Sequence, residues 1–227
     1  MTGVQTCALP IFYLFSGRVM REALADPAQT DFGKEVIPGL LKTKRMMGYV
    51  FDGYWEDIGT VGSFWECNLT LTDPVPPFDF FDGSNPVYTH ARYLPTAKLN
   101  GCKANRVLMA DGAIVDDSEI TRCVIGVRSV VRGGSRLENV VMMGADAFER
   151  PHDLAKNHAL GRPDIGVGPN CVIRNAIIDK NARIGAGCRL SPIGLPEKWE
   201  SESLFVRDGV IVVKKGAVVP PGTVVGE

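Results

Sequence analysis

Residues 172–190 read VIRNAIIDKNARIGAGCRL, and an aliphatic residue stands at every sixth position of this stretch. These residues are Val172, Ile178, Ile184 and Leu190, with Asn and Gly recurring between them. In a hexapeptide repeat, six residues form one short strand and a turn, and three repeats complete one coil of a parallel β-helix. The stretch therefore predicts a β-helix with a buried aliphatic column.

The same spacing recurs on both sides of this stretch. The alternative is plain strand alternation, since six is a multiple of two, but alternation alone would not keep its phase between recurring Gly and Asn. We predict a hexapeptide β-helix over 99–227, interrupted once by a loop at 147–164. Its further columns are Leu108, Ile114 and Ile120, then Ile125, Val131, Leu137 and Met143, and finally Val212, Val218 and Val224.

Residues 12–73 have the pattern of an α/β protein, in which short segments of helical and strand character alternate. Helices are favoured where apolar residues recur at helical spacing after a capping residue such as Thr30 or Asp31. Strands are favoured in the short apolar runs. The expected helices lie within 17–26, 30–43 and 62–73, and the expected strands within 12–15 and 45–60.

Residues 74–98 have the composition of a linker, with five Pro and aromatic residues between them. A free linker would be richer in Ser, Gly or charge. The aromatics therefore predict that this segment packs on a neighbouring surface. They are Phe78, Phe80, Phe81, Tyr88 and Tyr93.

Bulk properties exclude several classes of protein. The 227 residues carry a formal net charge of -1, which gives no electrostatic case for nucleic acid or an anionic membrane as a partner. No apolar run approaches the ~18 residues that span a bilayer. The six Cys form no C-x-x-C pair, which argues against a zinc site and a disulfide scaffold and favours buried thiols in a reducing cytoplasm.

Several motifs, in the order in which they occur, resemble ADP-glucose pyrophosphorylase (glucose-1-phosphate adenylyltransferase). They are TDFGKEVIPGLL, GYWEDIGT, NPVYTHARYLPTAKL, VMMGAD and AIIDKNARIG, and the resemblance runs from Phe12 to Val225. It implies the end of a Rossmann-like nucleotidyltransferase domain over 12–73, a linker over 74–98, and a left-handed β-helix for regulation and oligomerisation over 99–227. It also implies a homotetramer in a cytoplasm, or a plastid in a plant.

The family joins ATP and glucose 1-phosphate into ADP-glucose and pyrophosphate for glycogen or starch synthesis. Both reactants are anions, so a divalent metal that neutralises charge and aligns groups is central to the reaction. Mg²⁺ prefers carboxylate oxygen and water. The resemblance assigns Asp57 to the metal and to catalysis, whereas the residue pattern alone favours a turn before Gly59. Glu56 is expected on the opposite side, in solvent.

The resemblance implies that Tyr13, Asp31, Phe32 and Trp55 line the glucose 1-phosphate pocket. A carboxylate accepts hydrogen bonds from sugar hydroxyls, and aromatic rings cover the sugar ring. From the residues alone, Asp31 is equally a helix N-cap, and packing explains Tyr13 and Phe32 at least as well.

A second implied site binds small anionic effectors or phosphate. The family positions for it are Arg92, Lys180 and Lys215, with His90 and Arg183 as weaker candidates. Arg binds phosphate through two parallel N–H donors of its planar guanidinium, and Lys binds it through the point charge of its ammonium group. Without the resemblance, each of these residues would be interpreted as a solvated surface charge.

Two other functions fit parts of the sequence. Some hexapeptide β-helices are acyltransferases with a loop His as general base, and His152 and His158 lie on the predicted loop. The supporting context is missing, so this is the weaker hypothesis. A non-catalytic regulatory subunit is the third.

The first eleven residues, MTGVQTCALPI, match the translation of a common sequencing adapter. We interpret residues 1–11 as a non-native leader that precedes a truncated gene fragment. The family's Gly-rich nucleotide loop, first metal-binding Asp and sugar-phosphate Lys precede the matching segment and are not found in this sequence. We therefore expect the 227-residue chain to be inactive by itself.

Overall fold

The computed structural model describes residues 12–226, which form two units. The first ends at Gly53 and the second begins at Tyr54, and each is described by itself. Within the described residues, no helix has both the length and the apolar character needed to cross a membrane.

The first unit contains three short helices: α1 (Gly17–Ala23), the π-helix η1 (Phe32–Val36) and α2 (Ile37–Leu41). Asp31 caps η1 by accepting a hydrogen bond from the Lys34 N–H (2.9 Å), and the Glu35 carboxylate accepts from the Thr30 N–H (2.6 Å). This reciprocal capping fixes the start of the helix, as the sequence predicts. A small core of Ala23, Val36 and Leu40, with Phe15, Val19 and Phe32 against it, holds the unit together.

The predicted strands at 12–15 and 45–60 do not form in the described part of the chain. Phe12 and Leu14 are largely exposed, and the second segment runs as irregular chain. A strand is stable only with a hydrogen-bonded neighbour and a surface that covers its apolar side. The described residues 12–53 contain neither. The apolar residues of these two segments therefore lie in exposed, irregular chain.

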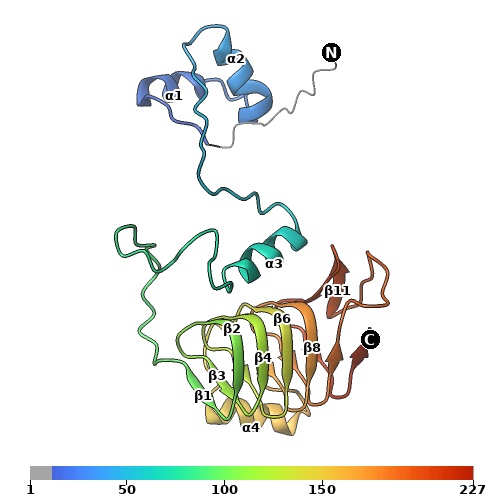
Figure 1. Cartoon of the computed structure of the whole chain (residues 1–227). Coiled ribbons are helices and arrows are strands. Elements are labelled where there is room, and N and C mark those ends of the chain that lie inside the picture. The colour runs from blue at the N-terminus through green and yellow to red at the C-terminus, as the bar shows by residue number, and fades with distance from the viewer. Residues whose placement is uncertain (1–11, 227) are drawn as a thin grey trace, which may run out of the picture. The chain divides into compact units, whose positions relative to one another are not determined.

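The second unit is a parallel β-helix with two helices on it, α3 (Val61–Thr70) and α4 (Pro151–Ala159) (Figure 1). Successive coils stack in register, with Ile120 beside Leu137 and Leu137 beside Ile173. The strands are β1 (Lys98–Asn100), β2 (Lys103–Met109), β3 (Ile114–Asp116), β4 (Glu119–Ile125), β5 (Val130–Val131), β6 (Arg136–Met142), β7 (Gly166–Val167), β8 (Val172–Ile178), β9 (Arg183–Ile184), β10 (Arg189–Leu190), β11 (Leu204–Arg207), β12 (Val210–Val213), β13 (Val218–Val219) and β14 (Val224–Val225).

Two excursions interrupt the coil, where we predicted one. Val131 pairs with Val167, which confirms the predicted interruption, and the added residues carry the nine-residue helix α4 where we predicted a loop. Ile177 pairs with Val212, and the added residues include β11, which forms an antiparallel hairpin with β12. The prediction of a single interruption is wrong because the second excursion rejoins the repeat through β12, whose valines continue the aliphatic pattern.

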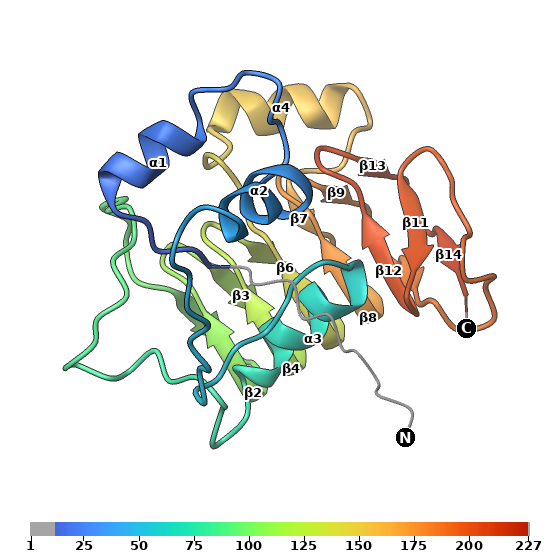
Figure 2. The ribbon, with the colours of Figure 1, turned by 90° about the horizontal axis from the view of Figure 1, so that it is seen from above.

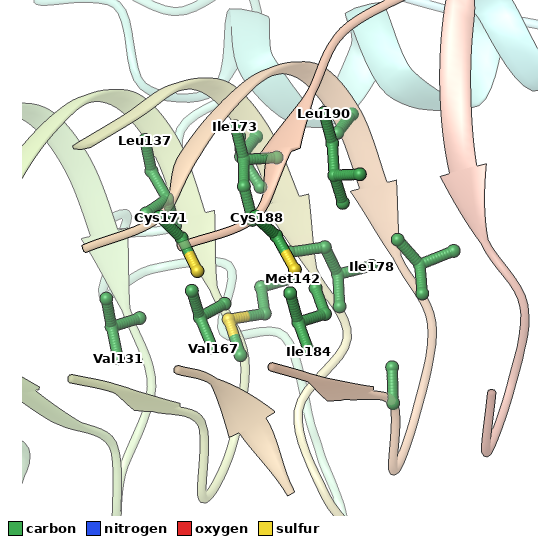
Figure 3. Packing of buried hydrophobic residues seen from close by; sticks show 14 of the residues in the cluster. Val131, Leu137, Met142, Val167, Cys171, Ile173, Ile178, Ile184, Cys188 and Leu190 are labelled. Carbon is green, nitrogen blue, oxygen red and sulfur yellow. The ribbon is translucent and has the colours of Figure 1, made fainter. Parts of the chain in front are cut away.

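The buried columns follow the prediction at some positions and are shifted by one residue at others (Figure 3). Ile184 and Leu190 are fully enclosed, but Val218 and Val224 are exposed while Val219 is buried. Likewise Met142, Ile173 and Val115 are buried in place of Met143, Val172 and Ile114.

The shift has a backbone cause. Arg122, Asn139 and Asn175 have positive φ and lie inside β4, β6 and β8, where each is skipped in the strand register. Each marks a corner made by one left-handed residue, and the buried residues on either side of it are five positions apart rather than six. Examples of these five-residue steps are Ile120 to Ile125, Leu137 to Met142, and Ile173 to Ile178.

A second corner is held by a column of small hydroxyl and thiol groups. Each donates a hydrogen bond to a backbone carbonyl oxygen, for example Ser135 Oγ to Gly168 (3.0 Å) and Cys171 Sγ to Gly185 (3.1 Å). The donors lie just before successive strands of the same face, so the column satisfies corner carbonyls that no strand partner reaches. Its members are Cys102, Ser118, Ser135, Cys171, Cys188 and Thr223.

We expect Ser135→Ala to lower the free energy of unfolding by about 1–3 kcal/mol, because it leaves buried backbone groups unpaired. Ser135 is 2% exposed, and its Oγ also accepts from the Cys171 N–H (3.1 Å). Ser135→Cys is the matched control, since Cys occupies the same place in the next two coils, and it should lose less. Urea unfolding measures both; equal losses would show that the hydrogen bonds do not stabilise the corner.

Helix α3 packs on the first corner, above β4 and β6 (Figure 2). Leu69 is fully buried there with Val141 and Val210, and the Trp65 indole N–H donates to the Asn139 carbonyl oxygen (2.9 Å). Arg122 forms an ion pair with Glu66 (2.6 Å). We predicted α3 as part of the catalytic remnant, but by packing it belongs to the β-helix unit.

The linker aromatics are more exposed than predicted. Phe81, Tyr88 and Tyr93 are 85%, 90% and 97% exposed, and only Phe78 and Phe80 contact one another, edge to face at 5.2 Å. Within the described residues, these aromatic side chains lack the covering surface that their composition predicts.

Candidate functional site

The segment 54–60, which carries Trp55 and Asp57, is attached to α3 at both ends. The Tyr54 hydroxyl contacts Cys67 Sγ (3.8 Å), and this contact raises the pKa of Tyr54 above its usual range. At the other end Thr60 caps α3, since its side chain accepts from the Ser63 N–H (3.1 Å) while Ser63 Oγ accepts from the Thr60 N–H (3.0 Å). Trp55 and Asp57 are solvent-exposed between these two attachments.

Asp57 can supply one oxygen ligand to a metal ion, and Glu56 lies beside it in the chain. Among the described residues, no group of three or more His, Cys, Asp or Glu side chains is arranged to hold a metal ion. Mg²⁺ typically binds one or two carboxylates and completes its shell with water and substrate phosphates. The donor set therefore fits a Mg²⁺ that is held largely by its substrates.

Three of the predicted sugar-pocket residues lie together in the first unit. The rings of Tyr13 and Phe32 are stacked with centroids 6.0 Å apart, and Asp31 precedes Phe32. The second carboxylate oxygen of Asp31 lies 4.0 Å from Lys34 Nζ, while the first caps η1. The cap and the aromatic packing are the structural roles that the residues alone suggest, and both leave side-chain atoms accessible.

Lys180 and Lys215 lie on adjoining turns of the β-helix, because the Gly216 N–H donates to the Lys180 carbonyl oxygen (2.8 Å). Lys180 Nζ forms an ion pair with Asp146 (3.1 Å). Asn181 binds the same carboxylate through its Nδ2 (2.8 Å) and accepts from the Asp146 N–H (2.9 Å). We call Asp146, Lys180, Asn181 and Lys215 the lysine cluster.

The carboxylate of this cluster is held in its charged form. The hydrogen bond from Asn181, then the bond and charge of Lys180, and more weakly the charge of Lys215, lower the pKa of Asp146. At neutral pH Asp146 therefore offsets part of the positive charge of the two lysines. An anion that binds the lysines has to compete with it.

Lys215 also lines an open pocket of ≈ 520 Å³ together with Glu202, Ser203, Lys214 and Gly216. Lys214 is engaged elsewhere, with its Nζ on Glu200 (3.0 Å) and on the Ser201 carbonyl oxygen (2.9 Å). Lys214 and Lys215 therefore both line the pocket, and the Lys214 ammonium also holds the second excursion.

The remaining predicted effector residues lie in other surroundings. Arg92 and His90 belong to the linker, and Arg92 donates to the His90 carbonyl oxygen (3.2 Å). The Arg183 guanidinium pairs with Glu149 (2.7 Å) and donates to the Pro163 carbonyl oxygen (2.9 Å), with only 14% of its side chain exposed. These contacts tie the α4 excursion to the coil, so the structure gives Arg183 an anchoring role.

His152 and His158 are exposed on α4. His152 Nε2 lies 3.1 Å from the Asp153 carboxylate, which is itself engaged in capping α4 through the Arg150 N–H (2.9 Å). This pairing is explained by the cap alone and gives no support to a catalytic histidine.

Two family models match the chain. Residues 92–224 match the GLGC left-handed parallel beta-helix domain, and residues 4–74 match the nucleotidyl transferase domain. Together with the fold, they define a nucleotidyltransferase with a left-handed β-helix, which confirms the predicted fold class. The first match spans more than half of the chain, and the chain belongs to the ADP-glucose pyrophosphorylase-like family.

The second match ends just beyond α3. By sequence α3 therefore belongs to the nucleotidyltransferase part, whereas by packing it belongs to the β-helix. Sequence reasoning missed this double membership, and it also missed Asp146 and Asn181. Both residues lie inside motifs that carry the resemblance, VMMGAD and DKNARIG, which was the available signal.

Proposed function

We propose that this chain is part of a glucose-1-phosphate adenylyltransferase, which makes ADP-glucose and pyrophosphate from ATP and glucose 1-phosphate for glycogen or starch synthesis. In this reaction a phosphate oxygen of the sugar phosphate attacks the α-phosphorus of ATP. The bond from that phosphorus to the β-phosphate oxygen breaks, and pyrophosphate leaves. Mg²⁺ bound at Asp57 would neutralise charge on the phosphates. Trp55, Tyr13, Asp31 and Phe32 would bind and orient the sugar phosphate.

The observation that carries the proposal is the lysine cluster on the β-helix of a nucleotidyltransferase. Lys180 and Lys215 occupy adjoining turns, and Lys215 opens to a pocket. One ammonium group in a pocket, with a second on the adjoining turn, suits a small anionic metabolite or inorganic phosphate. Arg92 and His90 from the linker are the further proposed members of this effector site.

Titration with inorganic phosphate tests the effector site. Replacing Lys180 or Lys215 by Gln should weaken binding about 5-fold or more, since each removes a charge-assisted contact. Asp146→Asn should tighten binding, because it removes the competing carboxylate and keeps the side-chain shape. Lys103→Gln is the matched control, because Lys103 is also paired with a carboxylate, that of Glu119 (3.0 Å), but does not line the pocket. Binding by this variant should stay within about 2-fold of the unmodified protein. Unchanged binding in both site variants would contradict the assignment.

Further parts of the proposal concern the whole enzyme. We propose a homotetramer in the cytoplasm, or in a plastid in a plant, and no ADP-glucose formation by the 227-residue chain alone. The predicted non-native leader, residues 1–11, lies outside the described residues. Because the nucleotidyl transferase match begins at residue 4, a genomic read through this junction is the appropriate check.

A further inference from the structure

One hydrogen bond joins the start of α3 to the second excursion of the β-helix. The Asp208 carboxylate accepts from the Gly62 N–H (2.9 Å). The two chains are in close contact here, because a Cβ built on Gly62 would lie 2.8 Å from Asp208 Cβ. Gly62 is the second residue of α3 and follows Thr60, the cap that ends the segment carrying Asp57.

Asp208 has a fixed position because it forms the turn of the β11–β12 hairpin. Asp208 and Gly209 both have positive φ (53° and 71°), the arrangement of a tight two-residue turn between antiparallel strands. Arg207 pairs with Val210 across the turn, and Leu204 pairs with Val213 at the open end.

The open end of the same hairpin leads to the lysine cluster. β12 ends at Val213, and Lys214 and Lys215 follow directly. β12 is also hydrogen-bonded to β8, where Val213 pairs with Ile178, and Lys180 follows two residues after Ile178. The hairpin therefore has the proposed effector lysines at one end and the contact with α3 at the other.

The rest of α3 is held along its length, so a shift at Gly62 is transmitted to the segment before it rather than absorbed by the helix. Leu69 is fully buried, Trp65 is bonded to the Asn139 carbonyl oxygen, and Glu66 is paired with Arg122. Among the described residues, the side-chain hydrogen bonds of the exposed segment 54–60 are made at its two ends, Tyr54 and Thr60. This segment is the part of this assembly that has room to move.

We propose that Asp208 is a positioning residue: it couples the lysine cluster to the Asp57 segment through the β11–β12 hairpin and the first turn of α3. The proposal rests on the effector site proposed above. An anion bound at Lys180 and Lys215 changes the position of β12, the Asp208 turn follows, and the Gly62 N–H carries the change to Thr60 and Asp57.

Two substitutions at one position isolate the hydrogen bond. Asp208→Asn keeps a carbonyl oxygen that can accept from Gly62, and Asn tolerates positive φ. Asp208→Gly also suits positive φ but removes the acceptor. The two variants therefore differ in the link itself, while the turn is preserved in both.

Amide hydrogen exchange of peptides covering 54–66, with and without saturating inorganic phosphate, reads the coupling directly. In the unmodified chain and in Asp208→Asn, phosphate should slow exchange there by about 5-fold or more. In Asp208→Gly, phosphate should bind with similar affinity in a separate titration but change this exchange by less than about 2-fold. A merely structural role of Asp208 would alter exchange equally with and without phosphate.

The outcomes separate the two proposals. If phosphate binds the unmodified chain but 54–66 does not respond, or if Asp208→Gly responds like Asp208→Asn, the coupling is refuted and the effector site stands. If phosphate does not bind the unmodified chain, the effector site is refuted and the coupling with it.

Discussion

Asp57→Asn is expected to lower the rate of ADP-glucose formation by about 10²–10³-fold in an active form of the enzyme that contains this segment. The metal contributes several kcal/mol of charge stabilisation in such reactions, and an amide oxygen binds Mg²⁺ far less strongly than a carboxylate. Asp57 is exposed and makes the only proposed contribution of the described residues to the metal. Steady-state kinetics over a range of Mg²⁺ concentrations measure the effect.

Glu56→Gln is the control for this prediction. Glu56 adjoins Asp57 and is also exposed. The Glu56→Gln substitution therefore removes the same charge one position away. We expect a change of less than about 3-fold, because an exposed charge acts weakly through solvent. Equal losses in the two variants would mean that general electrostatics, and not metal ligation by Asp57, explain the effect.

The second large effect is expected at Gly144 in the β-helix. Gly144 has φ of 88°, and a Cβ there would overlap the Val127 carbonyl oxygen of the preceding coil. Gly144→Ala combines backbone strain with a steric clash against main-chain atoms, which side-chain rotation cannot relieve. We expect the free energy of unfolding to fall by about 3–5 kcal/mol, measured by urea denaturation.

Gly187→Ala separates strain from the clash. Gly187 has φ of 70°, but a Cβ there would have no heavy atom within 4 Å. Only the cost of the left-handed backbone remains, about 1–2 kcal/mol. If both variants lose the same stability, close coil stacking at Gly144 is not the cause.

The β-helix could be predicted from sequence because its signal is repeated. Ile178, Ile184 and Leu190 are all buried at the predicted spacing, because each coil needs an apolar residue at the same position to fill the core. The exact phase could not be predicted, because a corner formed by one left-handed residue, such as Asn139 or Asn175, shortens the step by one. An Asn in the middle of an apolar strand was the available signal.

The first unit and the linker were harder to predict because their apolar residues have no repeated context. Phe12–Phe15 have strand character, but a strand depends on a partner that a local pattern does not specify. Conversely, the helix at 61–70 was predicted correctly from its spacing, yet its packing on the β-helix depends on Asn139 and Arg122, which are far away in sequence.

The candidate site shows the same division. Lys180 and Lys215 were identified through a motif, and the structure brings them together on adjoining turns. The carboxylate that pairs with Lys180, from Asp146, lies 34 positions away in the sequence, on the adjoining coil. Such a contact follows from coil stacking and is not visible in any one segment of sequence.

The most direct test of the account is a nucleotidyl-transfer assay on a form of the protein in which this chain is joined to a complete nucleotidyltransferase domain. With Mg²⁺, glucose 1-phosphate and each nucleoside triphosphate in turn, we predict ADP-glucose and pyrophosphate from ATP, at a rate that phosphate alters only when Lys180 and Lys215 are present. Preference for another nucleotide, or the same phosphate response after both lysines are replaced by Gln, would contradict the account.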